Sequence, residues 1–165
     1  MFASFAKFAD RLNGFFGFVS GLAVVCAAGL IVAEIACRVV SGGSLMVSDE
    51  YSGYLMAVSS FMGLGYVEMK GGHLRMDLVD ILRARCPRLS RCLRVMCYAL
   101  AAGFALYLTW VGWDIFFRSL VRGSKSVQIS ETPLALPQAF LPLGSAALFI
   151  QYIRNVMSEV WSAWS

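Results

Sequence analysis

Residues 15–37 read FFGFVSGLAVVCAAGLIVAEIAC, and Glu34 is the only charged residue among them. A helix that crosses a membrane needs about 20 mostly apolar residues, because the hydrocarbon core is about 30 Å thick and each residue adds about 1.5 Å. This run therefore predicts a transmembrane helix. The whole chain agrees, since 59% of its 165 residues are hydrophobic and 15% are charged. Soluble domains carry about 25% charged residues, so a soluble fold is excluded.

Three further runs have the length and composition of spanning helices, at residues 51–69, 95–117 and 136–153. Little of the chain remains for a domain outside the membrane. We therefore predict an all-α membrane protein, in which residues 1–165 form a single domain with four transmembrane helices.

Basic residues are distributed unevenly between the two sides that four spans define. The side with both termini and the connection between spans two and three holds ten Lys and Arg residues; the other side holds Arg38, Arg118, Arg122 and Lys125. Cytoplasmic segments carry the excess of Lys and Arg, so we expect both termini to be cytoplasmic. This asymmetry also explains the net charge of +4. Membrane lipids are therefore expected partners and nucleic acid is not.

Two segments beside the spans have amphipathic patterns. Phenylalanines recur at helical spacing before residue 16, which predicts a helix along the membrane surface before the chain turns into span one. Between spans two and three, apolar and charged residues alternate at helical spacing over residues 77–91. We expect a cytoplasmic interfacial arm there, with Pro87 opening the helix that leads into span three. The arm could brace a partner, or it could be a basic face against anionic lipid.

Several classes of function are disfavoured by the residues that carry chemistry. His73 is the only histidine, which excludes a haem held by two histidines of this chain. The five cysteines include no C-x-x-C pair, which weighs against a membrane thiol oxidoreductase. We expect no catalytic, cofactor or metal site in this chain.

Carboxylates in the spans lie near the span ends rather than at their centres. Glu34 precedes Arg38 by four residues, and Asp114 precedes Arg118 by four, so each can form an ion pair along its helix. Glu68 lies at the end of span two. These positions predict structural pairing rather than a proton pathway.

Small residues in span two, Gly63 and Gly65 among them, can bring helix backbones close together in lipid. They are candidate contacts with a partner. Packing among the helices of this chain explains them equally well, and the sequence does not separate the two.

The order of several short motifs resembles a known family. Ser48-Asp49-Glu50 opens span two, and Gly71-Gly72-His73-Leu74-Arg75-Met76-Asp77 follows that span. Leu136-Pro137-Gln138 and Leu141-Pro142-Leu143-Gly144 open span four. With the length and the four spans, this set resembles the small membrane subunit of the tripartite ATP-independent periplasmic (TRAP) transporters, the DctQ-like family. The resemblance covers essentially the whole chain.

This resemblance implies a subunit of a secondary uptake system in the bacterial cell inner membrane. The implied partners are a large membrane subunit, which carries the substrate and sodium sites, and a periplasmic substrate-binding protein. The small subunit would act as a scaffold for symport by the large one, often of an organic acid. The alternatives are the small subunit of another tripartite uptake system and, with less support, the thiol oxidoreductase.

Matching residues to the family's motifs gives candidate interface positions. Asp49 and Glu50 match the acidic start of span two, where they could contact the docking protein or only stabilise the first turn through the helix dipole. Arg75 and Asp77 are further candidate contacts. Gly71 and His73 are candidates for ordering the turn into the arm.

Overall fold

The computed structural model describes residues 2–43, 47–71, 87–126 and 131–161. The described residues form helices and no strand, which confirms the all-α class. The helices are α1 (Phe2–Ser41), α2 (Ser48–Met69), α4 (Pro87–Arg122) and α5 (Ala135–Trp161).

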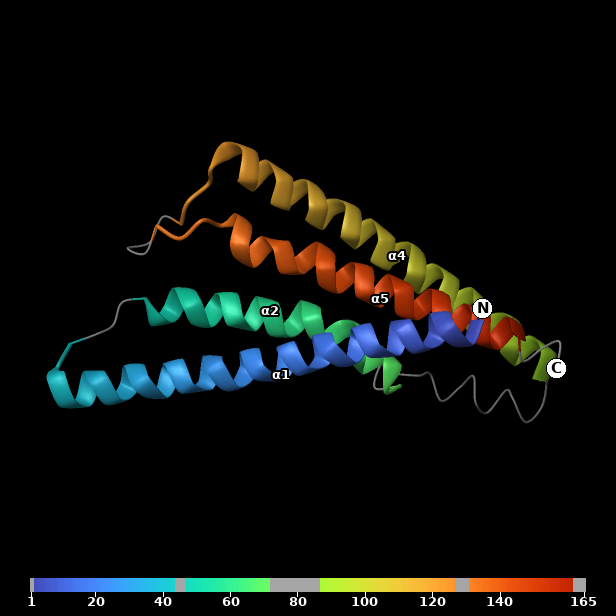
Figure 1. Cartoon of the computed structure of the whole chain (residues 1–165), viewed down its shortest axis with the longest axis horizontal. Helices are drawn as coiled ribbons and strands as arrows, with labels where there is room; N and C mark the ends of the chain where they lie inside the picture. Colours follow the sequence, from blue (N-terminus) through green and yellow to red (C-terminus); the bar gives the residue numbers. More distant parts are fainter. Residues whose placement is uncertain (1, 44–46, 72–86, 127–130, 162–165) are drawn as a thin grey trace.

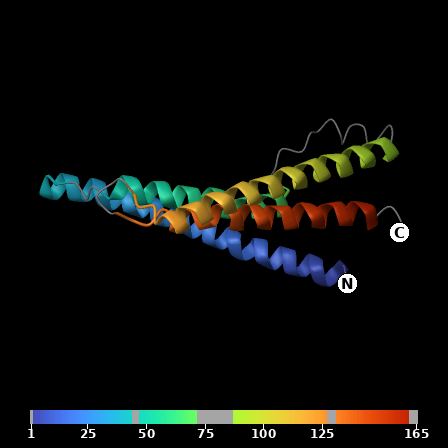
Figure 2. The same cartoon turned by 90° about the horizontal axis from the view of Figure 1, so that it is seen from above.

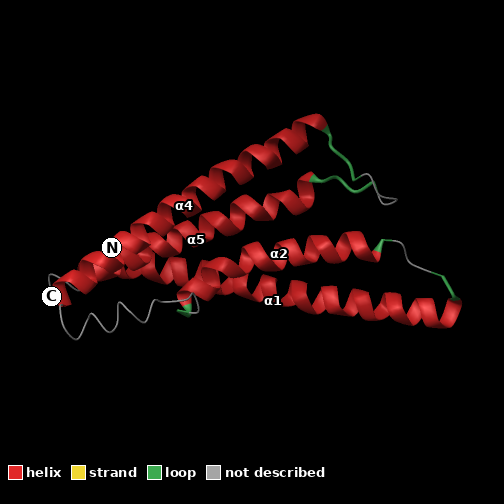
Figure 3. Ribbon diagram, turned by 180° about the vertical axis from the view of Figure 1, so that it is seen from behind, coloured by secondary structure: helices red, strands yellow, loops and turns green. Residues whose placement is uncertain are grey.

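The helices form two antiparallel pairs that meet along one seam. α1 packs on α2 and α4 packs on α5, while α2 and α5 join the pairs. In Figures 1 and 3 the two pairs overlap at the end where the termini lie and stand apart at the end with the α1–α2 and α4–α5 connections, whereas in Figure 2 the helices fan out at the end with the termini, so the two pairs cross each other. We call these the terminal end and the loop end. Within the described residues α4 contacts no helix but α5, so most of its surface is left without a partner.

Three helices are long and apolar enough to cross a membrane, over Ser4–Val40, Leu89–Arg122 and Ala135–Val160. They contain the predicted spans 15–37, 95–117 and 136–153. α2 does not reach this standard, because three carboxylates, several serines and several glycines dilute its apolar residues. The fourth span at 51–69 stays a prediction, and most of the expected arm lies outside the described residues.

The start of α1 differs from the expectation. A separate surface helix before a turn was predicted, but α1 runs without interruption from Phe2 to Ser41. Ala9 and Asn13 are fully buried, because this part of α1 packs against other helices of the chain instead of lying on lipid. The prediction that Pro87 opens a helix is confirmed, since α4 begins there.

The buried core is small. Its cluster comprises Ala23, Val58 and Met62, whereas large apolar side chains are exposed along every helix. Such a surface is stable in lipid or against another apolar protein surface, and not in water.

Candidate functional site

The two acidic residues that open α2 have different surroundings. Asp49 is exposed at the loop end of the molecule. Glu50 is 6% exposed, and its carboxylate accepts a hydrogen bond of 2.5 Å from the hydroxyl of Tyr54. Of these two carboxylates, Asp49 is therefore the one that presents its charge at the surface.

Glu34 of α1 also contributes to the loop end. It accepts a hydrogen bond of 3.0 Å from Arg38, which confirms the predicted pair, and one of 2.9 Å from the hydroxyl of Ser48. Val47 occupies the N-cap position of α2, and no side chain caps that helix by a hydrogen bond. The charge of the acidic pair in the first turn favours this helix end through the helix dipole.

A contact between two side-chain hydroxyls joins the connection between α4 and α5 to the start of α2. The amide of Ser126 donates to the carbonyl of Thr132 over 2.9 Å, beside an antiparallel bridge between Lys125 and Pro133. The hydroxyls of Tyr51 and Thr132 lie 3.1 Å apart. Asp49 and the stem of this connection therefore both lie at the loop end, near the start of α2.

Gly63 and Gly65 both face neighbouring helices of this chain. A methyl group on Gly63 would approach the hydroxyl of Ser20 to 2.9 Å, and one on Gly65 would overlap the side-chain oxygen of Asn13. The absence of a side chain thus lets α1 approach α2. These contacts supply the internal-packing explanation, and a contact of these glycines with a partner stays a prediction.

A third close approach lies between α2 and α5. A methyl group on Gly144 would overlap the backbone carbonyl of Phe61. Neither backbone can rotate away as a side chain can. Gly144 therefore sets the distance between the two helix pairs.

A group of polar side chains joins α1, α2 and α5 at the terminal end. The amide of Asn13 donates to the side-chain oxygen of Gln151 over 2.7 Å, and both residues are fully buried. Asp10 pairs with Arg154 at 3.2 Å, and Asn155 donates to Glu68 over 2.6 Å. We call these six residues the terminal clasp. The clasp was not predicted: Asn13 stands visibly beside an apolar run, but its partner Gln151 is 138 positions away.

α2 ends where the predicted turn after span two begins. Gly71 has φ of 70°, and its amide donates to the carbonyl of Glu68 over 2.9 Å. Such a left-handed residue ends a helix at the position where glycine is favoured. His73, Arg75 and Asp77 lie outside the described residues, so their roles stay predictions.

The side chains that could bind a metal ion or form a disulfide lie apart in the described residues. No three His, Cys, Asp or Glu side chains among them gather in a way that could hold a metal ion. Cys26, Cys37, Cys92 and Cys97 are free.

Comparison with known proteins identifies the family. The model of the DctQ component of tripartite ATP-independent periplasmic transporters matches residues 27–161. The chain belongs to this family. No curated protein and no solved structure matches it. The DctQ family match confirms the resemblance and makes the chain a transporter component, not an enzyme, with helices embedded in a membrane.

Proposed function

We propose that this DctQ protein is the scaffold of a TRAP transporter in the bacterial inner membrane, where it holds the large membrane subunit. The observation that carries the proposal is the family match over residues 27–161. The exposed apolar faces of α1 and α4 support it, because a scaffold in lipid needs such surface for a partner.

We propose further that α2 is the fourth span. It has 22 residues, or about 33 Å at the usual rise, which is sufficient for the hydrocarbon core. It packs on both α1 and α5, and its carboxylates lie at its ends. Four spans put both termini on one side, and the excess of Lys and Arg there favours the cytoplasm.

With this orientation the loop end faces the periplasm, and Asp49 with the stem of the α4–α5 connection is the docking surface for a substrate-binding protein. Substrate choice and sodium coupling belong to the other subunits, with organic acids as the expected substrates and symport as the mode. An exposed charge at a transient interface contributes mainly to encounter and orientation.

The scaffold role predicts a complex. Co-expression with a large subunit from the same organism should yield both chains together after solubilisation in mild detergent and affinity purification of this chain. Uptake in vesicles should require both. Repeated recovery of this chain alone, with the large subunit folded and present in the membrane, would contradict the scaffold role.

The docking role predicts different effects at the two acidic positions. Asp49→Arg should lower uptake at least tenfold and leave the complex intact, because Asp49 is exposed. Glu50→Gln should instead lower the stability of the chain itself, because it weakens the partly buried hydrogen bond from Tyr54. Uptake and complex recovery measure the two effects separately.

The orientation of the chain in the membrane is also tested at Asp49. Asp49→Cys, in a chain without its native cysteines, should react in whole cells with a thiol reagent that cannot cross the inner membrane. Reaction only after lysis would overturn the orientation, and unchanged uptake by Asp49→Arg would overturn docking at this residue.

A further inference from the structure

The two ends of the molecule differ in how their basic side chains are paired. At the loop end, most of the described basic side chains form ion pairs: Arg38 with Glu34, Arg118 with Asp114 and Lys125 with Glu131. At the terminal end, the described carboxylates are already engaged: Asp10 with Arg154, Glu68 with Asn155 and Glu159 with Arg94. The exposed basic side chains left there without an ion pair to any described carboxylate are Lys7, Arg11, Lys70 and Arg91. The terminal end therefore has free positive charge to offer an anion.

Three of these free cations come from α1 and α2, which lie side by side. The antiparallel register of the two helices is set by close approaches of Ser20 to Gly63, Gly17 to Tyr66 and Asn13 to Gly65. Continued at the same rise per residue, this register puts Lys70 level with residues 8–13 of α1. Arg11 lies within that range, and Lys7 lies one turn further along on the same side of α1. The charges of Arg11 and Lys70 therefore meet at one depth, at the junction of α1 and α2.

An aromatic ring and bare backbone lie next to these charges. A methyl group on Gly17 would overlap the ring of Tyr66, so this ring packs directly on the backbone of α1. The ammonium group of Lys70 lies 5.6 Å from the centre of the same ring, which is a cation–π distance. Gly14 and Gly21 lie one turn to either side of Gly17, and a methyl group on either would meet nothing within 4 Å. The surface of α1 beside the ring is therefore open and apolar, with the free cations at one end of it.

The depth of Arg11 in the membrane follows from the length of α1. The part of α1 from Arg11 to Arg38 is about 40 Å long at the usual rise per residue. A bilayer with its headgroups is about 40–45 Å thick. When α1 crosses the membrane, Arg11 and Arg38 therefore lie at the two headgroup layers. Arg38 is paired there with Glu34 of its own helix, whereas Arg11 is free to contact a lipid phosphate.

We propose that an anionic phospholipid of the cytoplasmic leaflet binds at the junction of α1 and α2, with its phosphate held by Arg11 and Lys70 and an acyl chain along Tyr66 and Gly21. The choice of leaflet rests on the orientation given under the proposed function. Basic sites between transmembrane helices on the cytoplasmic side suit anionic headgroups. A lipid whose headgroup carries its own ammonium group fits less well, because that group would be repelled by the same cations.

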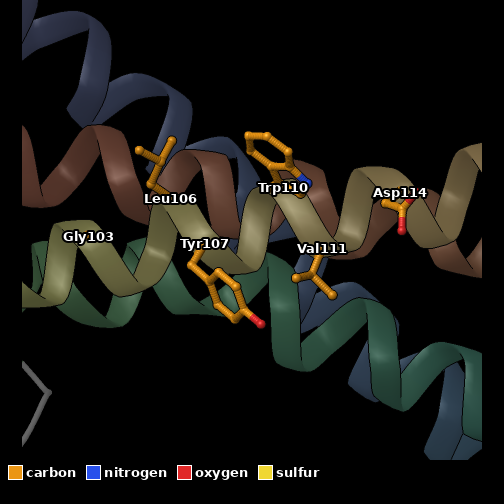
Figure 4. A pocket seen from close by; sticks show the side chains of 6 residues that line it. All are labelled: Gly103, Leu106, Tyr107, Trp110, Val111 and Asp114. Carbon is orange, nitrogen blue, oxygen red and sulfur yellow. The ribbon is translucent and has the colours of Figure 1, made fainter.

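A hollow on the surface of α4 has a different character. It measures about 520 Å³, and Figure 4 shows that aromatic and aliphatic side chains line it, with the carboxylate of Asp114 at one end. Its lining includes no basic side chain, and Asp114 is already paired with Arg118. The hollow offers no free cation to a phosphate, which leaves the junction of α1 and α2 as the better match for an anionic headgroup.

Titration of the purified full chain with phosphatidylglycerol in a neutral detergent, followed by native mass spectrometry, measures the headgroup contact. Arg11→Gln combined with Lys70→Gln should lower the affinity about 25-fold, because one basic residue beside an anionic lipid contributes about fivefold. The matched control is Arg91→Gln, which removes an exposed, unpaired charge at the same end of the molecule. Arg91 belongs to α4, which contacts only α5 among the described helices, so its loss should change the affinity less than about twofold. Equal losses in the double variant and the control would show diffuse attraction and overturn the proposal.

Two further ligands test the class of lipid and the source of the phosphate. Phosphatidylethanolamine with the same acyl chains should bind about tenfold more weakly than phosphatidylglycerol. Inorganic phosphate at the same concentration should not displace the bound lipid. Equal binding of the two lipids would overturn the choice of an anionic headgroup, and displacement by inorganic phosphate would show a site for a soluble anion instead.

Gly21→Leu tests the path of the acyl chain, because its side chain covers the open surface beside Tyr66. Gly29→Leu is the control, because it makes the same change at an equally open glycine about 12 Å nearer to the loop end. Gly21→Leu should lower the affinity for phosphatidylglycerol about threefold through lost packing, and Gly29→Leu should leave it unchanged. Equal affinities of the two variants would overturn this path.

Folding is followed separately by the thermal stability of each variant without added lipid. Lys70→Gln alone, with an expected loss of about fivefold, replaces the double variant if the latter is less stable. Lipid binding by the purified chain needs no other subunit, so the two proposals can fail independently. If the chain recovers the large subunit but shows no preference for phosphatidylglycerol, the lipid site alone fails. If it binds this lipid but recovers no large subunit, the scaffold role fails.

Discussion

Gly144→Leu is expected to separate α2 from α5 and to destabilise the protein more than any other single change considered. The first atom of the new side chain would overlap the backbone carbonyl of Phe61. Overpacking in a protein core costs about 1–3 kcal/mol when side chains can adjust. Here the obstructing atoms are backbone, so we expect at least the upper end of that range, about 3 kcal/mol.

Titration of the purified protein with SDS, followed by tryptophan fluorescence, measures the free energy of unfolding. Gly29→Leu is the control, because it makes the same change in a membrane-spanning helix where nothing lies within 4 Å. The two helix pairs should also lose their contact, which cysteines placed in α2 and α5 would report by cross-linking. Equal stability of the two variants would show that Gly144 does not set the helix distance.

The three helices that are long and apolar enough to cross a membrane were predictable, because the thickness of the bilayer fixes the length of an apolar run. The positions of the helix ends could not be predicted from hydropathy. Hydropathy recognises only the apolar centre, so it missed that α1 continues without a break from Phe2 into span one and that α4 extends to Arg122. These ends mix charged with apolar residues, and packing against other helices keeps at least the start of α1 in place.

The sequence could not separate Asp49 from Glu50. Consecutive residues on a helix point about 100° apart, so one can be buried while its neighbour is exposed. Which one is buried depends on α2's neighbours, and they come from distant parts of the chain. The bond between Asn13 and Gln151 joins residues 138 positions apart, and no local pattern indicates it.

The face of α4 that packs on α5 also could not be recognised in the sequence. Almost every residue of the run 95–117 is apolar. A helical period is visible only when polar residues mark the other face. The structure supplies the missing contrast, because it shows which of these apolar residues face α5.

Removing one half of the buried amide pair in the terminal clasp is expected to have the second largest effect. Asn13→Leu leaves Gln151 fully buried at the junction of three helices and without its donor. An unsatisfied buried polar group costs about 1–3 kcal/mol. The new side chain must also avoid Gly65, which lies directly against the Asn13 side-chain oxygen.

The double variant Asn13→Leu with Gln151→Leu distinguishes a specific bond from general packing. If the bond is what matters, each single change should destabilise the protein by about 1–3 kcal/mol, and the double change should cost less than the sum because it leaves no orphaned amide. The same SDS titration measures all three, with Ser60→Leu as the control at an exposed position of α2. Strictly additive losses would mean that the two amides act independently. The clasp would then be a set of separate contacts, and the packing of α1 and α2 against α5 would depend on the close contacts at Gly65 and Gly144.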